Sequence, residues 1–178
     1  MKRKDDQETE LAQQDEEEIV YKRALLLLKF RKRSRSEMER RLLEKGFPED
    51  LVARTVERLE QQGLIDDEIL VQCWRQDRES FRPKGKRLLA VELKRAGVAP
   101  QIVEDGLKDV DDRQSAYQAA EKKARLWAGL DYDEFRKKLS AYLSRRGYDW
   151  GVIHEVVQRL WQDSKTTSAT SSQRESPP

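Results

Sequence analysis

The sequence predicts an all-α fold in which three tandem three-helix repeats form an elongated, curved rod. Apolar residues recur at intervals of three and four, without sustained period-two alternation, which is typical of amphipathic helices. Gly46, Gly97 and Gly147 lie 51 and 50 residues apart, and their surroundings align without gaps. Because a unit of about 45 residues buries too little surface to be stable alone, we expect neighbouring repeats to stack.

The aligned repeats share one apolar pattern. Leu42, Leu93 and Leu143 stand four residues before the repeat glycine, and six other positions are also apolar in all three copies. We expect the apolar stripes before and after the glycine to pack the second helix of each repeat against the third. The second helix should end at the glycine, because a left-handed residue after the last turn favours a residue without Cβ.

A further amphipathic helix precedes each of these pairs, which gives three helices per repeat. Ser36-Glu37-Met38-Glu39 fits a capping box at the start of a second helix, with Ser36 as the capping hydroxyl. Pro48 and Pro100 fit the first turn of a third helix, where a missing N–H is tolerated. The three preceding helices are expected at residues 21–32, 67–80 and 113–127.

The two ends of the chain differ from this helical middle. Residues 1–20 carry three basic and eight acidic side chains, and residues 163–178 are rich in serine and threonine. Neither segment can bury a core, so we expect both to be disordered. The net charge of +2 thus combines an acidic tail of −5 with a basic middle of +7. The repeats are expected at residues 21–65, 66–111 and 112–162.

Composition excludes several classes of protein. Cys73 and His154 are the only residues of their types, which rules out an internal disulfide and a Cys/His zinc site. His154 lies in an amphipathic stretch and is expected to be a surface or half-buried residue rather than a general base. Without a glycine-rich phosphate loop, we expect neither a cofactor nor enzyme activity. The longest aliphatic run, Ala24–Leu28, is too short for a membrane span, and no apolar signal segment follows Met1–Asp6, so we expect a cytoplasmic protein.

Basic residues gather before the second helix and before the repeat glycines, whereas acidic residues gather in the third helix. Helix-dipole matching, at about 0.3–1 kcal/mol per residue, explains part of this. It does not explain Arg82–Arg87, with four basic residues in six and no acid. Rows of cations bind phosphates without reading sequence, and an acidic third helix argues against a helix-turn-helix reader. The candidate phosphate-binding residues are Arg31, Lys32, Arg33, Arg35, Arg40, Arg41, Arg75, Arg78, Arg82, Lys84, Lys86, Arg87, Lys94, Arg95, Lys137, Lys138, Arg145 and Arg146.

Four stretches, in a characteristic order and spacing, give the chain a family resemblance. They are Arg33–Leu42 with Gly46-Phe47, Gly63–Asp67, Glu92–Val98 and Leu143–Tyr148. Through them, residues 21–162 resemble the RecX regulatory proteins of bacteria, which modulate the RecA recombinase. The resemblance implies a non-enzymatic monomer that binds the RecA–DNA filament in its helical groove and inhibits recombinase, ATPase and LexA-coprotease activity. It also implies nonspecific binding to single- and double-stranded DNA, with the candidate residues contacting DNA or the filament.

Other interpretations stay open beside this one. The runner-up is a nonspecific DNA-binding protein of the nucleoid type, without a recombinase partner. A helical repeat scaffold for another protein comes third, and an enzyme is the least favoured. The acidic residues within 5–18 suggest in addition a tail that competes with DNA for the basic faces.

Overall fold

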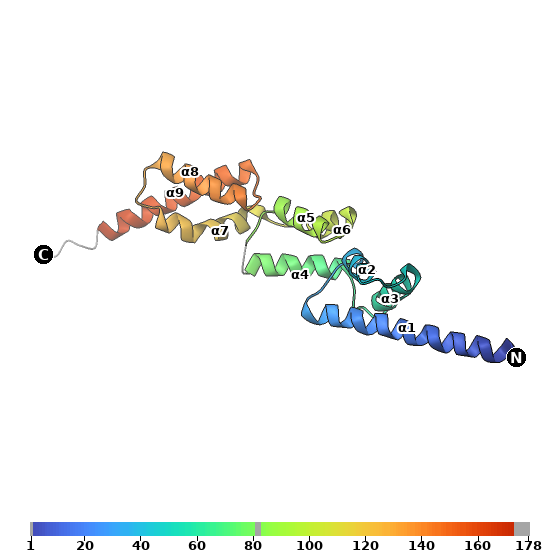
Figure 1. The fold of residues 1–178 in the computed structure, drawn as a ribbon. Coiled ribbons are helices and arrows are strands. Elements are labelled where there is room, and N and C mark those ends of the chain that lie inside the picture. The colour runs from blue at the N-terminus through green and yellow to red at the C-terminus, as the bar shows by residue number, and fades with distance from the viewer. Residues whose placement is uncertain (1, 81–82, 173–178) are drawn as a thin grey trace. The chain divides into compact units, whose positions relative to one another are not determined.

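A computed structural model describes residues 2–80 and 83–172, with side chains over residues 14–77 and 83–165 (Figure 1). The described residues form nine α-helices and no strand, which confirms the all-α fold class. The helices are α1 (Lys2–Phe30), α2 (Arg35–Leu43), α3 (Glu49–Gln61), α4 (Asp67–Ser80), α5 (Lys86–Arg95), α6 (Pro100–Gly106), α7 (Asp112–Leu126), α8 (Tyr132–Arg145) and α9 (Trp150–Ser172).

The chain divides into two compact units. The first comprises Met1–Gln72 with Leu93–Asp105, and the second comprises Cys73–Glu92 with Gly106–Pro178. Helices α1, α2 and α3 pack against one another in the first unit, and α7, α8 and α9 do so in the second. The middle repeat contributes to both units, because α4 and α5 are each divided between them. The predicted repeat boundaries and the rod shape stay predictions.

The core of the first unit lies between α1, α2 and α3. Val20 and Ala24 of α1 are buried there, four residues apart on one face of the helix. Met38 and Leu42 of α2 and Leu59 of α3 complete this part of the core, each fully buried. Burying a side chain of this size contributes about 1.5–3 kcal/mol, so the predicted apolar stripes account for the packing of the three helices.

The core of the second unit lies between α7, α8 and α9. Ala116, Ala120 and Ala124 form a buried stripe of small side chains along α7, which allows the neighbouring helices to approach its backbone. Phe135 of α8 packs against Trp161 of α9 with ring centroids 5.2 Å apart. The small residues of one helix thus complement the large aromatic residues of the other two.

The three repeat glycines adopt the left-handed conformation predicted for helix stops, with φ of 84° at Gly46, 87° at Gly97 and 83° at Gly147. Packing also excludes a side chain at two of them. A Cβ added at Gly97 would lie 2.9 Å from Ser36 Cβ, and one added at Gly147 would lie 2.3 Å from Leu88 Cβ. The corresponding space at Gly46 is open. The second and third glycine turns are therefore in contact with the preceding repeat.

We call this contact between consecutive repeats a joint, and the first joint lies within the first unit. The Ser34 hydroxyl donates a hydrogen bond to the carbonyl of Ala96, in the glycine turn of repeat 2. The backbone N–H of Arg35 donates to the carboxylate of Asp67, at the start of α4, at 2.9 Å. Two groups of repeat 2 thus hold the N-terminus of α2 in repeat 1.

The second joint lies within the second unit and repeats the same arrangement. The backbone N–H of Gly85 donates to the carbonyl of Arg146 at 2.9 Å, in the glycine turn of repeat 3. The backbone N–H of Lys86 donates to the carboxylate of Asp112 at 2.8 Å. In both joints an aspartate of the following repeat accepts from an N-terminal N–H of the second helix, a group that the helix itself leaves unsatisfied.

Both ends of the chain differ from the expectation of disorder. Helix α1 begins at Lys2, and α9 continues to Ser172. Residues 2–30 contain no glycine or proline and are rich in strong helix formers, so the helix extends through a segment too polar to form a core. The remaining part of the predicted C-terminal tail, residues 173–178, lies outside the described residues.

The cap of α2 is Ser34, so the prediction of Ser36 as the capping residue is wrong. The Ser34 hydroxyl accepts the N–H of Glu37 at 3.1 Å. Ser34 and Ser36 are each followed by a glutamate three residues later, so the sequence offered two registers for a capping box. The carboxylate of Glu37 is held by arginines instead.

Candidate nucleic-acid interface

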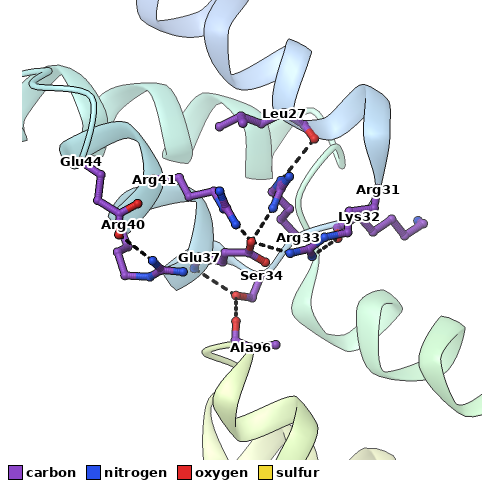
Figure 2. Close-up of polar contacts among 10 residues, drawn as sticks. All are labelled: Leu27, Arg31, Lys32, Arg33, Ser34, Glu37, Arg40, Arg41, Glu44 and Ala96. Atoms are coloured by element: carbon purple, nitrogen blue, oxygen red, sulfur yellow. Dashed lines mark hydrogen bonds and ion pairs between the residues drawn. The ribbon is translucent and has the colours of Figure 1, made fainter.

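The densest basic segment of the first unit lies at the junction of α1 and α2. Residues 29–41 contain seven basic and two acidic side chains. Three arginines of this segment surround the carboxylate of Glu37 (Figure 2). Arg31 Nη2 lies 2.6 Å and Arg41 Nε 2.9 Å from Glu37 Oε1. The Nη1 atom of Arg33 contacts the same oxygen. Three positive charges thus meet one negative charge.

Burial makes the Arg33–Glu37 pair the structural centre of this cluster. The two residues are only 8% and 5% exposed. Burial acts to raise the pKa of Glu37, but hydrogen bonds from Arg31 and Arg41 and the surrounding positive charges outweigh it, so the pKa is lowered. Burial lowers the pKa of Arg33, and Glu37 opposes that change. Arg33 Nε also donates to the carbonyl of Leu27 at 3.2 Å, which fastens the last turn of α1 to α2.

Arg33 is therefore a correction to the predicted binding residues, because its guanidinium is buried and is held by Glu37 and by the carbonyl of Leu27 rather than presented to an external phosphate. Arg35 and Arg40 remain about half exposed, although Arg35 pairs with Glu39 and Glu60 and Arg40 pairs with Glu44. Arg31 and Arg41 are 49% and 39% exposed while they share Glu37. Since one carboxylate neutralises only one of three guanidiniums, the cluster keeps a surplus of two positive charges.

The first joint brings a second basic segment to this junction. Lys94 and Arg95 close α5 and are both exposed. The next residue, Ala96, accepts the hydrogen bond from Ser34 at the start of α2. Two basic segments that are about 60 residues apart in sequence therefore meet at one joint. The burial of Asp67 in this joint raises its pKa, and the Arg35 N–H opposes the rise.

The second joint has the same composition. Lys84 pairs with Glu92, the Lys86 ammonium donates to the carbonyl of Lys108 at 3.3 Å, and Arg87 is exposed. This segment meets Arg145 and Arg146 through the hydrogen bond from Gly85. Arg145 is exposed, whereas the Arg146 guanidinium lies 4.5 Å from the centre of the Tyr142 ring. Burial also raises the pKa of Asp112, as it does for Asp67.

One position and one segment that are basic within the joints carry no basic residue in the repeats that form no joint there, whereas Lys45 before Gly46 matches Arg146 before Gly147. Two residues before the repeat glycine stand Arg95 and Arg145 in repeats 2 and 3, but Glu44 in repeat 1. Before the second helix, repeat 3 has Gly129-Leu130-Asp131 in place of the basic segments of repeats 1 and 2. At this position and in this segment, basic residues therefore occur where a joint forms.

The remaining candidate phosphate-binding residues say less about the interface. The Arg75 guanidinium donates to the carbonyl of Gly106 at 3.2 Å. Lys137 and Lys138 are exposed on α8. The side chain of Arg78 and the whole of Arg82 lie outside the described residues.

Two findings concern other kinds of site, within the residues that the structure describes. No group of three or more histidine, cysteine, aspartate or glutamate side chains is placed to hold a metal ion. None of the described helices is both long and apolar enough to cross a membrane.

Comparisons with known proteins agree with this architecture. Residues 21–59 match the family model for the first three-helix domain of RecX, and residues 111–157 match the model for its third. The regulatory protein RecX of Chlorobium limicola is 39% identical over 139 residues, which cover 78% of this chain and 87% of the relative. The RecX of Mycolicibacterium smegmatis is 38% identical over 140 residues, or 75% of this chain and 74% of the relative. The crystal structure of RecX from Lactobacillus salivarius has the same fold, with a TM-score of 0.73 at 23% identity over 82% of this chain and 97% of the other. On this similarity of sequence and fold, the chain belongs to the RecX family of regulatory proteins.

Proposed function

We propose that this protein is a non-enzymatic, monomeric regulator that binds the RecA–DNA filament in its helical groove and inhibits the ATPase and LexA-coprotease activities of RecA. In this proposal it also binds bare single- and double-stranded DNA without reading sequence. Its membership of the RecX family supports RecA as the partner. The observation that carries the DNA contact is the convergence of two basic segments at each joint.

The chemistry of the joints favours phosphates over bases. Each joint combines a basic segment before a second helix with the basic end of the next repeat's second helix. Every phosphate that such a cation neutralises releases condensed counterions, which gives affinity that is independent of sequence. No helix is required to enter a groove and read base edges, so the binding should be nonspecific.

The test compares two double variants with equal loss of charge. Arg95→Ala with Arg145→Ala removes one exposed cation from each joint, and Lys45→Ala with Lys122→Ala removes two exposed cations elsewhere. Binding to a RecA–single-stranded DNA filament and to bare single-stranded DNA is measured by fluorescence anisotropy between 50 and 200 mM salt. The joint variant should bind more weakly, and the slope of log K against log salt should be smaller by about 1.4, for two lost contacts of about 0.7 each. Equal binding and equal slopes for both variants would refute the assignment of the joints.

The runner-up interpretation, a nucleoid-type protein, makes a different prediction in the same assay. Such a protein would bind bare DNA through the same joints, and coating the DNA with RecA would weaken its binding because the phosphates are then covered. The proposed regulator should bind the filament at least as tightly as bare DNA. Weaker binding to the filament would therefore favour the nucleoid-type protein.

A further inference from the structure

Phe30, the last residue of α1, leaves its aromatic ring in solvent. It is 82% exposed, more than any other large apolar side chain among those whose exposure the structure describes. A single exposed apolar residue is common on protein surfaces and needs no function. The surroundings of Phe30 are what distinguish it.

The chain on both sides of Phe30 is basic. Lys29 precedes it, and Arg31 and Lys32 follow, and all three are exposed. The only acidic side chain that contacts Arg31 in the described structure is Glu37, whose single charge is shared among three arginines. The ring is thus placed in a region of surplus positive charge.

Trp150 provides a direct contrast. It is the other large aromatic residue that is strongly exposed among the described side chains, at 66%. The hollow beside it is lined by two acidic residues, Asp133 and Glu134, together with Arg136 and Lys137. Arg136 also lies 3.4 Å from Asp133. Mixed charge of this kind gives no preference for phosphates. Among the side chains that the structure describes, a strongly exposed aromatic ring and a basic surface therefore coincide only at Phe30.

The backbone on both sides of Phe30 is anchored by contacts of neighbouring residues. The carbonyl of Leu27, one turn earlier in α1, accepts a hydrogen bond from the buried Arg33 at 3.2 Å. The Arg31 guanidinium is held by Glu37 at 2.6 Å and by the carbonyl of Lys32 at 3.1 Å (Figure 2). A ligand that meets this surface therefore finds one neighbouring cation and the backbone that carries the ring already placed, which lowers the entropic cost of binding.

We propose that Phe30 is a stacking platform for an unpaired nucleobase of single-stranded nucleic acid, while the flanking Lys29 and Lys32 contact the adjacent phosphates. Aromatic rings between cations bind single strands in this way, because every base presents a π-face and every nucleotide a phosphate. A duplex keeps its bases paired and stacked inside, so the platform should distinguish single from double strands. The inference rests on the proposed function for the binding of DNA and adds the form of DNA that is preferred.

The experiment measures the affinity of the full chain for a labelled 30-nucleotide oligo-dT, the matching oligo-rU and a 30-base-pair DNA duplex. Phe30→Ala should weaken binding to the single strands by about five- to a hundredfold, the range expected for the loss of one stacked base. Binding to the duplex should change by less than about twofold. Equal losses of affinity for oligo-dT and oligo-rU assign the platform to unpaired bases of both DNA and RNA. A loss of affinity for oligo-dT alone assigns it to DNA.

Three further variants separate stacking from simple apolar contact. Phe30→Trp keeps a π-face and should retain affinity for single strands, whereas Phe30→Leu keeps the apolar character and should lose as much as Phe30→Ala. Trp150→Ala removes an exposed ring in mixed charge and should bind like the wild type. Equal affinity of Phe30→Ala and wild type for both single strands would overturn the inference. A loss of RecA inhibition without a loss of single-strand affinity would also overturn it, in favour of a protein contact. If the wild type binds no nucleic acid at all, the proposed function itself fails.

Discussion

Replacing Glu37 by alanine should destabilise the protein strongly, because the carboxylate is the only charged partner that the structure describes for the buried guanidinium of Arg33. Removing one member of a buried ion pair costs about 3–5 kcal/mol. The pairs with Arg31 and Arg41 involve arginines that are 49% and 39% exposed, so each adds at most about 1 kcal/mol. The total loss for Glu37→Ala is a large fraction of the roughly 5–15 kcal/mol that stabilises a typical domain.

Urea unfolding followed by circular dichroism at 222 nm measures this effect. With a slope near 2 kcal/mol per molar urea, the midpoint should fall by about 2 M. Glu44→Ala breaks the exposed pair with Arg40, at 59% and 54% exposure, and should change the free energy of unfolding by less than about 0.5 kcal/mol. Arg33→Met combined with Glu37→Ala removes the unpaired charge and should regain most of the loss.

Two results would refute this reasoning. One is a double variant no more stable than Glu37→Ala. The other is a loss of unfolding free energy for Glu37→Ala that is as small as the loss for Glu44→Ala.

The pH dependence of stability gives a further check. Since the pKa of Glu37 is lowered in the folded protein, its stabilisation is complete above the unfolded value of about 4.5 and is lost as the pH falls through the lower folded value. The wild type and Glu37→Ala should therefore converge in stability at low pH.

Three other predictions concern the joints and the acidic end. Gly147→Ala should lower the urea midpoint more than Gly46→Ala. Both variants strain a positive φ, but only at Gly147 would the added Cβ also lie 2.3 Å from the Cβ of Leu88. Equal decreases in the midpoint would show that the second joint is not formed. Asp112→Asn keeps an acceptor for Lys86 and should be at least as stable at pH 7. Burial raises the pKa of the wild-type Asp112 carboxyl, so its ionised form is less favourable in the folded protein than its protonated form. The difference in stability between variant and wild type should therefore vanish near pH 3, where the carboxyl is protonated. A clear loss at pH 7 would contradict this. Deleting residues 1–18, which carry three basic and eight acidic side chains, should tighten DNA binding at low salt if the acidic end competes with DNA, and unchanged affinity would exclude that competition.

Much of the fold could be predicted from local pattern. Leu42 and Gly46 illustrate why: a stripe of leucines marks the buried face, and a positive φ that only glycine adopts without strain marks the helix end. The extent of α1 could not be predicted in this way, since residues 2–18 carry no apolar stripe and only their intrinsic helix propensity indicates a helix. The choice between Ser34 and Ser36 as the cap depends on a tertiary partner, the carbonyl of Ala96.

The candidate site was predictable in residue type but not in arrangement. The candidate arginines and lysines were chosen because basic residues are dense in these stretches of the sequence. Arg33 was included because a buried guanidinium and an exposed one look alike in sequence. The pairing with Glu37 is visible as an i,i+4 spacing, but that spacing is common on exposed helices and does not indicate burial. The meeting of residues 31–36 with 94–97 depends on how repeats stack, and no local pattern encodes that contact.

In the proposed function, the joints attach this protein to a RecA–DNA filament and so restrain RecA. The rate of ATP hydrolysis by RecA on single-stranded DNA, with less than one molecule of this protein per RecA protomer, tests it most directly. We predict strong inhibition by the wild type, similar inhibition by Lys45→Ala with Lys122→Ala, and weak inhibition by Arg95→Ala with Arg145→Ala. A wild-type protein that binds DNA but leaves the rate of hydrolysis unchanged would refute the proposed regulation of RecA.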